Sequence, residues 1–131
     1  MSPLKTEIQG KVATLTLNRP AQMNTIDLGM AKALYEASLR FTEHSTVRAL
    51  IITGAGEKAF CAGGDLAAFN QHGEAVGEHL HEVTHYLHGA ISRFARMNLP
   101  VITAVNGVTA GGGLDFLGFP QLVLAADSAR F

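Results

Sequence analysis

The order of hydrophobic and polar residues divides the chain into segments of two kinds. Short apolar and β-branched runs that end at turn residues predict strands at "KVATLTLN", "VRALIITG", "PVITAVNG" and "LVLAAD". The second run is apolar throughout, which predicts a strand buried on both faces. Apolar residues spaced three and four apart predict a helix from an N-cap at Asn24 or Thr25 to about Phe41, and another from about Glu74 to Arg96. Strands that alternate with helices predict an α/β layered fold.

Two glycine-rich stretches interrupt this pattern, each placed between a strand and a helix. They are "AFCAGGDL", where a loop leads to a short helix opening at Asp65, and "NGVTAGGGLD", where glycines begin a helix. Glycine allows backbone conformations closed to other residues and lets a ligand approach bare N–H groups. In the second stretch the helix dipole also favours negative charge. One N–H donor from each loop could therefore hold a developing oxyanion, although tight turns without a ligand would need the same glycines.

Composition excludes several classes of protein. The 131 residues carry a formal net charge of -1, which offers no basic surface for nucleic acid. The start lacks the layout of a signal peptide, and no apolar run approaches the length that crosses a membrane. A single cysteine, Cys61, excludes an internal disulfide and fits a reducing compartment. We therefore expect a soluble, cytoplasmic protein of one domain, with no nucleic-acid or membrane partner.

Two short motifs suggest other chemistry. "HEVTH" at residues 81–85 has the spacing of a zinc metallopeptidase, in which two histidines bind the metal and the Glu is the general base. His81, His85 and His88 would share one helix face, but no Glu follows Glu82 to supply a third ligand. The interpretation that needs no metal is the polar face of an amphipathic helix, and zinc stays a distant alternative. "GAGEKA" resembles a dinucleotide fingerprint, but "CAGG" would break the helix that this site requires.

Taken together, the stretches "VATLTLNRPAQMNTI", "RALIITGAGEKAFCAGGDL", "LPVITAVNGVTAGGGLDF" and "LAADSARF" resemble the enoyl-CoA hydratase/isomerase (crotonase) family, in its N-terminal half. The resemblance implies a spiral of ββα units, the ClpP-like fold, truncated here before the C-terminal helical region. Residues 1–131 would be the N-terminal part of this domain. The family binds acyl-coenzyme A thioesters, so no cofactor is expected beyond the coenzyme A of the substrate. Its members assemble as trimers or dimers of trimers.

The resemblance also assigns residues. The thioester oxygen would lie between the N–H groups of Gly64 and Gly112, and Asp115 would be the general base, beside the oxyanion and partly desolvated. Further backbone contacts to the acyl-CoA fall at Gln22, Met23, Ala62, Asp65 and Leu66, and Asp65 would also cap the short helix. The implied activity is hydration of an enoyl-CoA or isomerisation of its double bond, and the Asp at 115, where hydratases carry Glu, tilts toward isomerisation. The helix that carries "HEVTH" would flank the acyl pocket without a metal.

The chain departs from the family pattern at its end. Family hydratases take a second carboxylate from just past "SARF", whereas this sequence stops at Phe131, directly after a predicted core strand. We expect a fragment of a longer product, since such a strand left uncovered would aggregate. The alternative is a catalytically incomplete module that binds coenzyme A or serves assembly.

Overall fold

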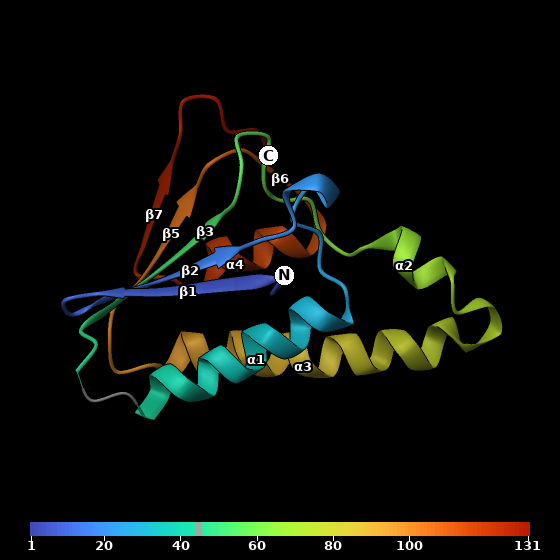
Figure 1. Ribbon diagram of the computed structural model, residues 1–131, viewed down its shortest axis with the longest axis horizontal. Helices are drawn as coiled ribbons and strands as arrows, with labels where there is room; N and C mark the ends of the chain where they lie inside the picture. The colour runs from blue at the N-terminus through green and yellow to red at the C-terminus, as the bar shows by residue number, and fades with distance from the viewer. Residues whose placement is uncertain (44–45) are drawn as a thin grey trace.

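The computed structural model describes residues 1–43 and 46–131 and places a five-stranded sheet over two long helices (Figure 1). The strands are β1 (Leu4–Gln9), β2 (Val12–Leu17), β3 (Ala49–Gly54), β5 (Val101–Val105) and β7 (Leu122–Ala125), in that order across the sheet. β1 is antiparallel to β2, and every other pairing is parallel. β4 (Ala59–Cys61) and β6 (Val108–Thr109) form a separate parallel pair.

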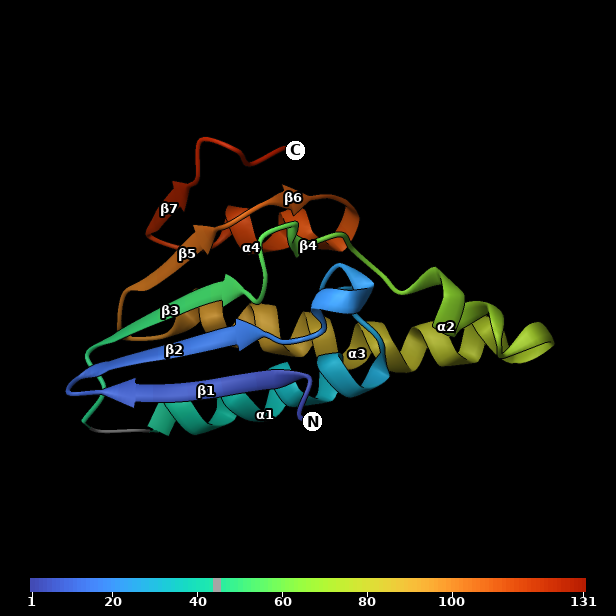
Figure 2. The same ribbon diagram turned by 45° about the horizontal axis from the view of Figure 1, so that its top comes forward.

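The helices complete a repeated ββα order along the chain. α1 (Leu28–Glu43) follows β1, β2 and the 3-10 turn η1 (Pro20–Gln22). β3 and β4 lead to α2 (Leu66–Asn70), η2 (Gly73–Ala75) and the long α3 (Val76–Arg96). β5 and β6 lead to η3 (Gly111–Leu114) and α4 (Asp115–Gly118), and the chain then enters β7. The predicted spiral of ββα units is therefore present (Figure 2).

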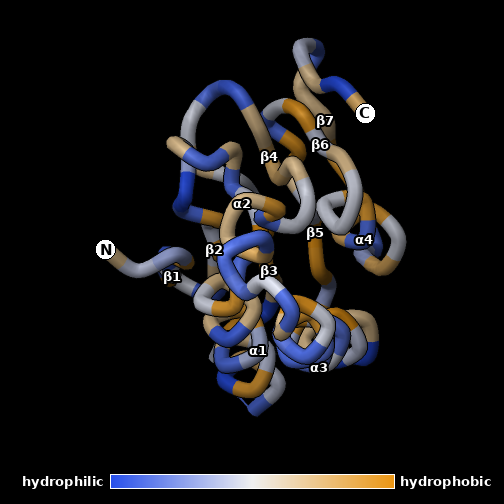
Figure 3. The backbone as a smooth tube through the Cα atoms, turned by 90° about the vertical axis from the view of Figure 1, so that its right-hand side faces the viewer, coloured by the Kyte–Doolittle hydropathy of each residue, from blue (hydrophilic) through white to orange (hydrophobic). Residues whose placement is uncertain are grey.

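The core lies between the sheet and the pair of helices α1 and α3, which run side by side along its lower face (Figures 1 and 2). In Figure 3, a stretch at β5 is hydrophobic (orange), whereas α1 and α3 carry both hydrophobic and hydrophilic stretches. The larger buried side chains of the two helices are Met30, Leu34, Phe41, Val83, Leu87 and Phe94. They fall at the helical spacing that the sequence predicts. Within the described ranges, no helix combines the length and apolar character needed to cross a membrane.

Several elements differ from the prediction. β3 alternates buried and partly buried residues, so only one of its faces is fully covered. β1 and the short strands β4 and β6 were not predicted, and β4 lies inside the stretch expected to be a loop. β7 is a strand as predicted, but all four of its residues are exposed, and it is not a core strand.

The N-cap of α1 is Asp27, and the prediction of Asn24 or Thr25 was wrong. The Asp27 carboxylate accepts a hydrogen bond from Met30 N at 2.8 Å. Thr25 instead donates its hydroxyl to Gln22 O at 2.9 Å. Asn24 is fully buried, with φ of 53°, a left-handed conformation that asparagine tolerates better than most residues.

The Asn24 side chain joins three parts of the backbone. Its amide nitrogen donates to Ala55 O and Ala59 O, each at 2.9 Å, and its oxygen accepts from Arg19 N at 2.9 Å. This fastens the turn after β2 to both ends of the loop between β3 and β4. Asn24 therefore links backbone segments instead of capping a helix. The sequence pattern alone does not distinguish these two roles of an asparagine.

Replacement of Asn24 by alanine should lower the free energy of unfolding by about 2–4 kcal/mol, because it leaves one buried N–H and two carbonyl groups with a lost partner. Urea unfolding followed by circular dichroism would measure this. Gln22→Ala, in the same turn but exposed, should change the free energy by less than about 0.5 kcal/mol. Equal effects of the two substitutions would contradict the role of Asn24.

Candidate functional site

The two glycine-rich loops meet because β4 and β6 pair. Ala59 is opposite Val108 and Cys61 is opposite Thr109. The pairing continues into the loops, where Ala110 N donates to Cys61 O at 3.1 Å. Residues about fifty positions apart in the sequence are thus held in one register at the ends of neighbouring strands, above α3.

Glycine is required at this junction by crowding. Gly63 has φ of 103°, and a Cβ added to it would lie 3.1 Å from Ala110 O and 3.4 Å from Gly112 N. A Cβ added to Gly113 would overlap the Cys61 carbonyl group. The backbones of the loops therefore touch directly, and side chains at these positions would force them apart.

The geometry directs the N–H of Gly64 away from its neighbouring strand. Gly64 forms an isolated parallel bridge with Ile26, made by Ile26 N donating to Gly63 O at 2.8 Å and Asp65 N donating to Ile26 O at 3.0 Å. In such a bridge the flanking residues make the bonds, so the N–H of the central residue faces the opposite side. Gly64 is exposed, and its N–H is available to a ligand.

Gly112 offers a second donor across the junction. It is the second residue of η3, and the N–H groups of a first helical turn have no carbonyl group of the same helix to accept from them. A Cβ added to Gly112 would have nothing within 4 Å, so open space lies beside it. The structure thus brings together the loops of the two predicted oxyanion glycines, Gly64 and Gly112.

Three aromatic rings in series, those of Phe69, His79 and His72, pack beside Gly64. The ring of Phe69 packs against Gly64, since an added Cβ there would lie 2.8 Å from Phe69 Cε2. The edge of His79 meets Phe69 with ring centroids 5.7 Å apart, and His79 stacks on His72 at 3.6 Å. The start of α3 therefore holds α2 and, through it, the loop of Gly64.

Asp65 caps α2, as predicted, and also anchors the loop to the turn after β2. Its carboxylate accepts from Ala68 N at 3.0 Å and pairs with the Arg19 guanidinium at 2.9 Å. Arg19 also contacts Asp27 at 3.4 Å. The hydrogen bond from Ala68 N and the contacts with Arg19 hold the pKa of Asp65 below its ordinary value, against the opposing effect of burial. The sequence gives no signal of this network, because Arg19 and Asp65 are 46 residues apart.

The other predicted acyl-CoA contacts lie around the same loop. Ala62 N donates to Met23 O at 3.1 Å, and Met23 is held at φ of 55° directly after the exposed Gln22. Leu66 is 71% exposed beside the Asp65 cap. These residues form one edge of the junction, and their contacts with a substrate stay a prediction.

Asp115 begins α4, three residues after Gly112, as the helix prediction requires. Its side chain is exposed, so the expectation of a partly desolvated carboxylate was wrong for the described residues. The charge of Asp115 still acts on the buried thiol of Cys61. Burial, chiefly, together with that charge raises the pKa of Cys61 to about 11. The thiol is therefore protonated near neutral pH and is a poor candidate nucleophile.

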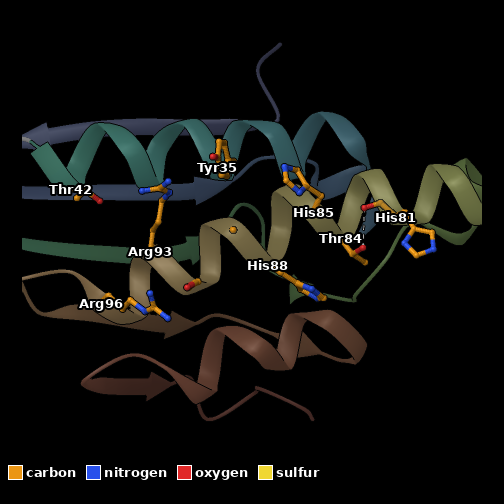
Figure 4. A pocket seen from close by; sticks show the side chains of 10 residues that line it. Tyr35, Thr42, His81, Thr84, His85, His88, Arg93 and Arg96 are labelled. Carbon is orange, nitrogen blue, oxygen red and sulfur yellow. Dashed lines mark hydrogen bonds between the residues drawn. The ribbon is translucent and has the colours of Figure 1, made fainter.

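The histidines of "HEVTH" lie on the exposed side of α3, as predicted. His81 and His85 line a hollow of about 830 Å³ beside α1, with Tyr35 and Arg93 (Figure 4). In the part of the chain that is described, no three His, Cys, Asp or Glu side chains gather as possible metal ligands. Among those residues, His81 and His85 therefore have no third His, Cys, Asp or Glu side chain grouped with them as a possible ligand.

Comparison with known proteins agrees with this arrangement. The sequence model of the family described as "Enoyl-CoA hydratase/isomerase" matches residues 7–131. The chain is 36% identical to 1,2-epoxyphenylacetyl-CoA isomerase of Escherichia coli (strain K12), covering 100% of this chain and 50% of that protein. It is 35% identical to mitochondrial 3-hydroxyisobutyryl-CoA hydrolase of Danio rerio, over 93% of this chain and 32% of the relative.

Solved structures give the same result. The crystal structure of an enoyl-CoA hydratase from Bacillus anthracis superimposes with a TM-score of 0.89 at 30% identity, covering 97% of this chain and 48% of that one. The chain spans half of the isomerase, about half of the hydratase and about a third of the hydrolase.

Asp65→Asn tests how the loop is anchored. Because the folded-state pKa of Asp65 is lowered, its charge stabilises the fold above the unfolded pKa of about 3.9. That stabilisation is lost as the pH falls through the folded pKa. The substitution should cost about 1–3 kcal/mol at pH 7, and the cost should become smaller as the pH falls below about 3.9.

Urea unfolding of both proteins at pH 7 and pH 3 would measure the difference in the free energy of unfolding. Asp127→Asn, at an exposed turn, serves as the control and should have little effect at either pH. A cost for Asp65→Asn that is unchanged at pH 3 would show that the charge plays no part.

Proposed function

The chain belongs to the enoyl-CoA hydratase/isomerase family and has the crotonase fold, and on this basis we propose that it acts on an acyl-CoA thioester. The N–H groups of Gly64 and Gly112 hold the thioester oxygen as an enolate forms. The reaction is hydration of an enoyl-CoA or isomerisation of its double bond. The observation that carries the proposal is the junction of the two glycine loops through β4 and β6.

The chemistry explains why such a junction is useful. Removal of a proton next to a thioester carbonyl group, or addition of water across the neighbouring double bond, places negative charge on the carbonyl oxygen. Two N–H donors fixed before the reaction stabilise that charge without reorganising, and loss of one such donor typically costs about 10²–10³ in rate. Gly63 and Gly113 allow the two loops to pack backbone against backbone, because a Cβ at either position would crowd the facing loop.

Names of the relatives support the substrate class more than the reaction. The three relatives described above are an isomerase, a hydrolase and a hydratase. Two of the names specify a coenzyme A ester in full, and the third specifies an enoyl-CoA. A shared oxyanion site with different surrounding groups would account for that variety, because each reaction can place negative charge on the thioester carbonyl oxygen, as an enolate or as a tetrahedral adduct.

Asp115 is the general base in this proposal. It follows the oxyanion turn of Gly112 directly, and its charge reaches the Cys61 thiol beneath the junction. A carboxylate so placed can take a proton from carbon or from water beside the bound thioester. Asp115 is exposed in the described residues. In this proposal, the bound substrate would shield its carboxylate from water.

The donor at Gly112 can be tested with a matched pair of variants. Gly112→Pro removes the N–H at a first-turn position that accommodates proline. Gly112→Ala keeps the N–H and adds a methyl group with no atom within 4 Å. With crotonyl-CoA as substrate, the proline variant should lose about 10²–10³ in kcat relative to the alanine variant. Thermal melting would check that both variants are folded.

Equal activities of the two variants would contradict the role of the Gly112 N–H. Calorimetric titration of the unaltered protein with crotonyl-CoA and butyryl-CoA tests the substrate class itself. Absence of binding to either would overturn it. Saturable binding without turnover by any protein in the series would instead support the alternative, a coenzyme A-binding module.

A further inference from the structure

A second hollow, of about 440 Å³, lies between α3 and α4, next to the junction of the glycine loops. Its polar lining consists of His88 and Ser92 from α3 and Asp115 from α4, and Ile91, Leu114 and Phe119 contribute apolar surface. It begins at the turn that carries Gly112, because Leu114 and Asp115 belong to η3 and α4. The general base proposed above therefore shares this hollow with an imidazole from the long helix.

The histidines of α3 point to different sides of that helix. His85 lies on the side of α1 and meets the ring of Tyr86 with centroids 5.2 Å apart (Figure 4). His88 points away from α1, toward the ribbon of η3 and α4 (Figure 4). Ile91 and Ser92, three and four residues after His88, line the hollow beside α4 together with it. His85 and His88 both line the hollow beside α1, and of these two only His88 also lines the hollow beside α4.

Among the described residues, the side chain of His88 makes no contact that would give it a role in stabilising the fold. Within residues 1–43 and 46–131, it makes no hydrogen bond, ion pair or ring contact, whereas His79 stacks on His72. The carboxylate of Asp115 likewise makes no hydrogen bond or ion pair in the described ranges. Two groups that transfer protons thus line one hollow with their polar atoms available to a ligand.

We propose that His88 is a catalytic residue, the second proton-transfer group of the site, which acts on the acyl chain from the opposite wall to Asp115. The inference rests on the proposed function, since it places an acyl-CoA thioester in the hollow. It assigns to this chain an acid–base pair made of a carboxylate and an imidazole. Both members lie within the 131 residues.

Proton transfer between the two groups balances over one cycle of isomerisation. The Asp115 carboxylate takes a proton from a carbon of the acyl chain, and the electron pair of that C–H bond moves toward the thioester oxygen. The resulting enolate is held by Gly64 and Gly112. The His88 imidazolium then gives a proton to a different carbon, and the carbonyl group re-forms. Transfer of a proton from Asp115 to His88, directly or through water, restores the starting state.

His88 is also placed to exchange protons with solvent. It is exposed and lines both the hollow beside α4 and the larger hollow beside α1. The charged and titratable groups that line the two hollows with it are Asp115 from α4, Tyr35 from α1, and His81, His85, Arg93 and Arg96 from α3. Imidazole is the side chain that changes charge most readily near neutral pH, so it suits this exchange.

The test compares His88→Gln with His85→Gln, which changes the same residue type one turn earlier on the same helix. With crotonyl-CoA and an isomeric 3-enoyl-CoA as substrates, His88→Gln should lower kcat by about 10²–10⁴, with KM changed by less than about threefold. It should also remove one limb of the pH profile of kcat. His85→Gln should leave kcat, KM and both limbs unchanged.

A second readout needs no turnover. In two-dimensional NMR spectra at fixed pH, Asp115→Asn should move the ring signals of His88 and leave those of His85 in place, because of these two histidines only His88 shares a hollow with the carboxylate. Butyryl-CoA should move the same His88 signals in a saturable manner. These spectra also check that each variant remains folded.

The outcomes separate this inference from the proposed function. If the unaltered protein turns over an acyl-CoA and His88→Gln keeps kcat within about twofold with an unchanged pH profile, His88 has no catalytic role and the proposed function stands. Unmoved His88 signals in Asp115→Asn would likewise overturn the pairing of the two groups. Failure of the unaltered protein to bind any acyl-CoA would overturn the proposed function, a result visible before any variant is made.

Discussion

The arrangement of the site depends on the direct backbone contact between two loops, which the short parallel pair β4 and β6 imposes. Cys61 and Ala110 share a hydrogen bond at that point, and Gly63 and Gly113 leave no space for a side chain. Two sets of side-chain contacts in the described residues hold these loops in place. Asn24 fastens the turn after β2 to the loop before β4, and Asp65 with Arg19 fastens the loop after it. A displacement of the contacts of Asn24, or of those between Asp65 and Arg19, would also displace the Gly64 N–H. Electrostatic stabilisation of an oxyanion tolerates little displacement of its donors.

The histidines of α3 illustrate how one sequence motif can divide into separate roles. His79 supports the Gly64 loop through Phe69, His85 lies beside α1, and His88 faces Asp115. The spacing in "HEVTH" matches a metal site only while the neighbouring helices are left out. Once α1 and α4 are in place, His85 and His88 both line the hollow beside α1, His88 also lines the hollow beside α4, and the described residues contain no group of three possible metal ligands. The role of each histidine of α3 therefore depends on the residues that surround its side chain in the fold.

Much of the fold could be predicted from the sequence, because long amphipathic helices and buried strands leave a clear periodicity. The helices near α1 and α3 and the strands near β2, β3, β5 and β7 were predicted for this reason. β4 and β6 were missed because two or three residues are too few to show a period, and their pairing is long-range. The positions of Gly64 and Gly112 could be predicted from glycine placement and family resemblance. The exposure of Asp115, the tie through Asn24 and the pairing of Arg19 with Asp65 could not, because each depends on a distant partner.

The central claim is that Gly64 N–H and Gly112 N–H together receive the oxygen of an acyl-CoA thioester. Amide proton shifts of the glycines, followed by NMR during titration with butyryl-CoA, test it most directly, since hydrogen bonding to an oxygen moves an amide proton downfield. Saturable downfield movement of the Gly64 and Gly112 amide proton signals is the expected result. Gly10 and Gly73, turn glycines with open space around them, should not move. Saturable binding of butyryl-CoA that leaves both Gly64 and Gly112 unmoved would contradict the account.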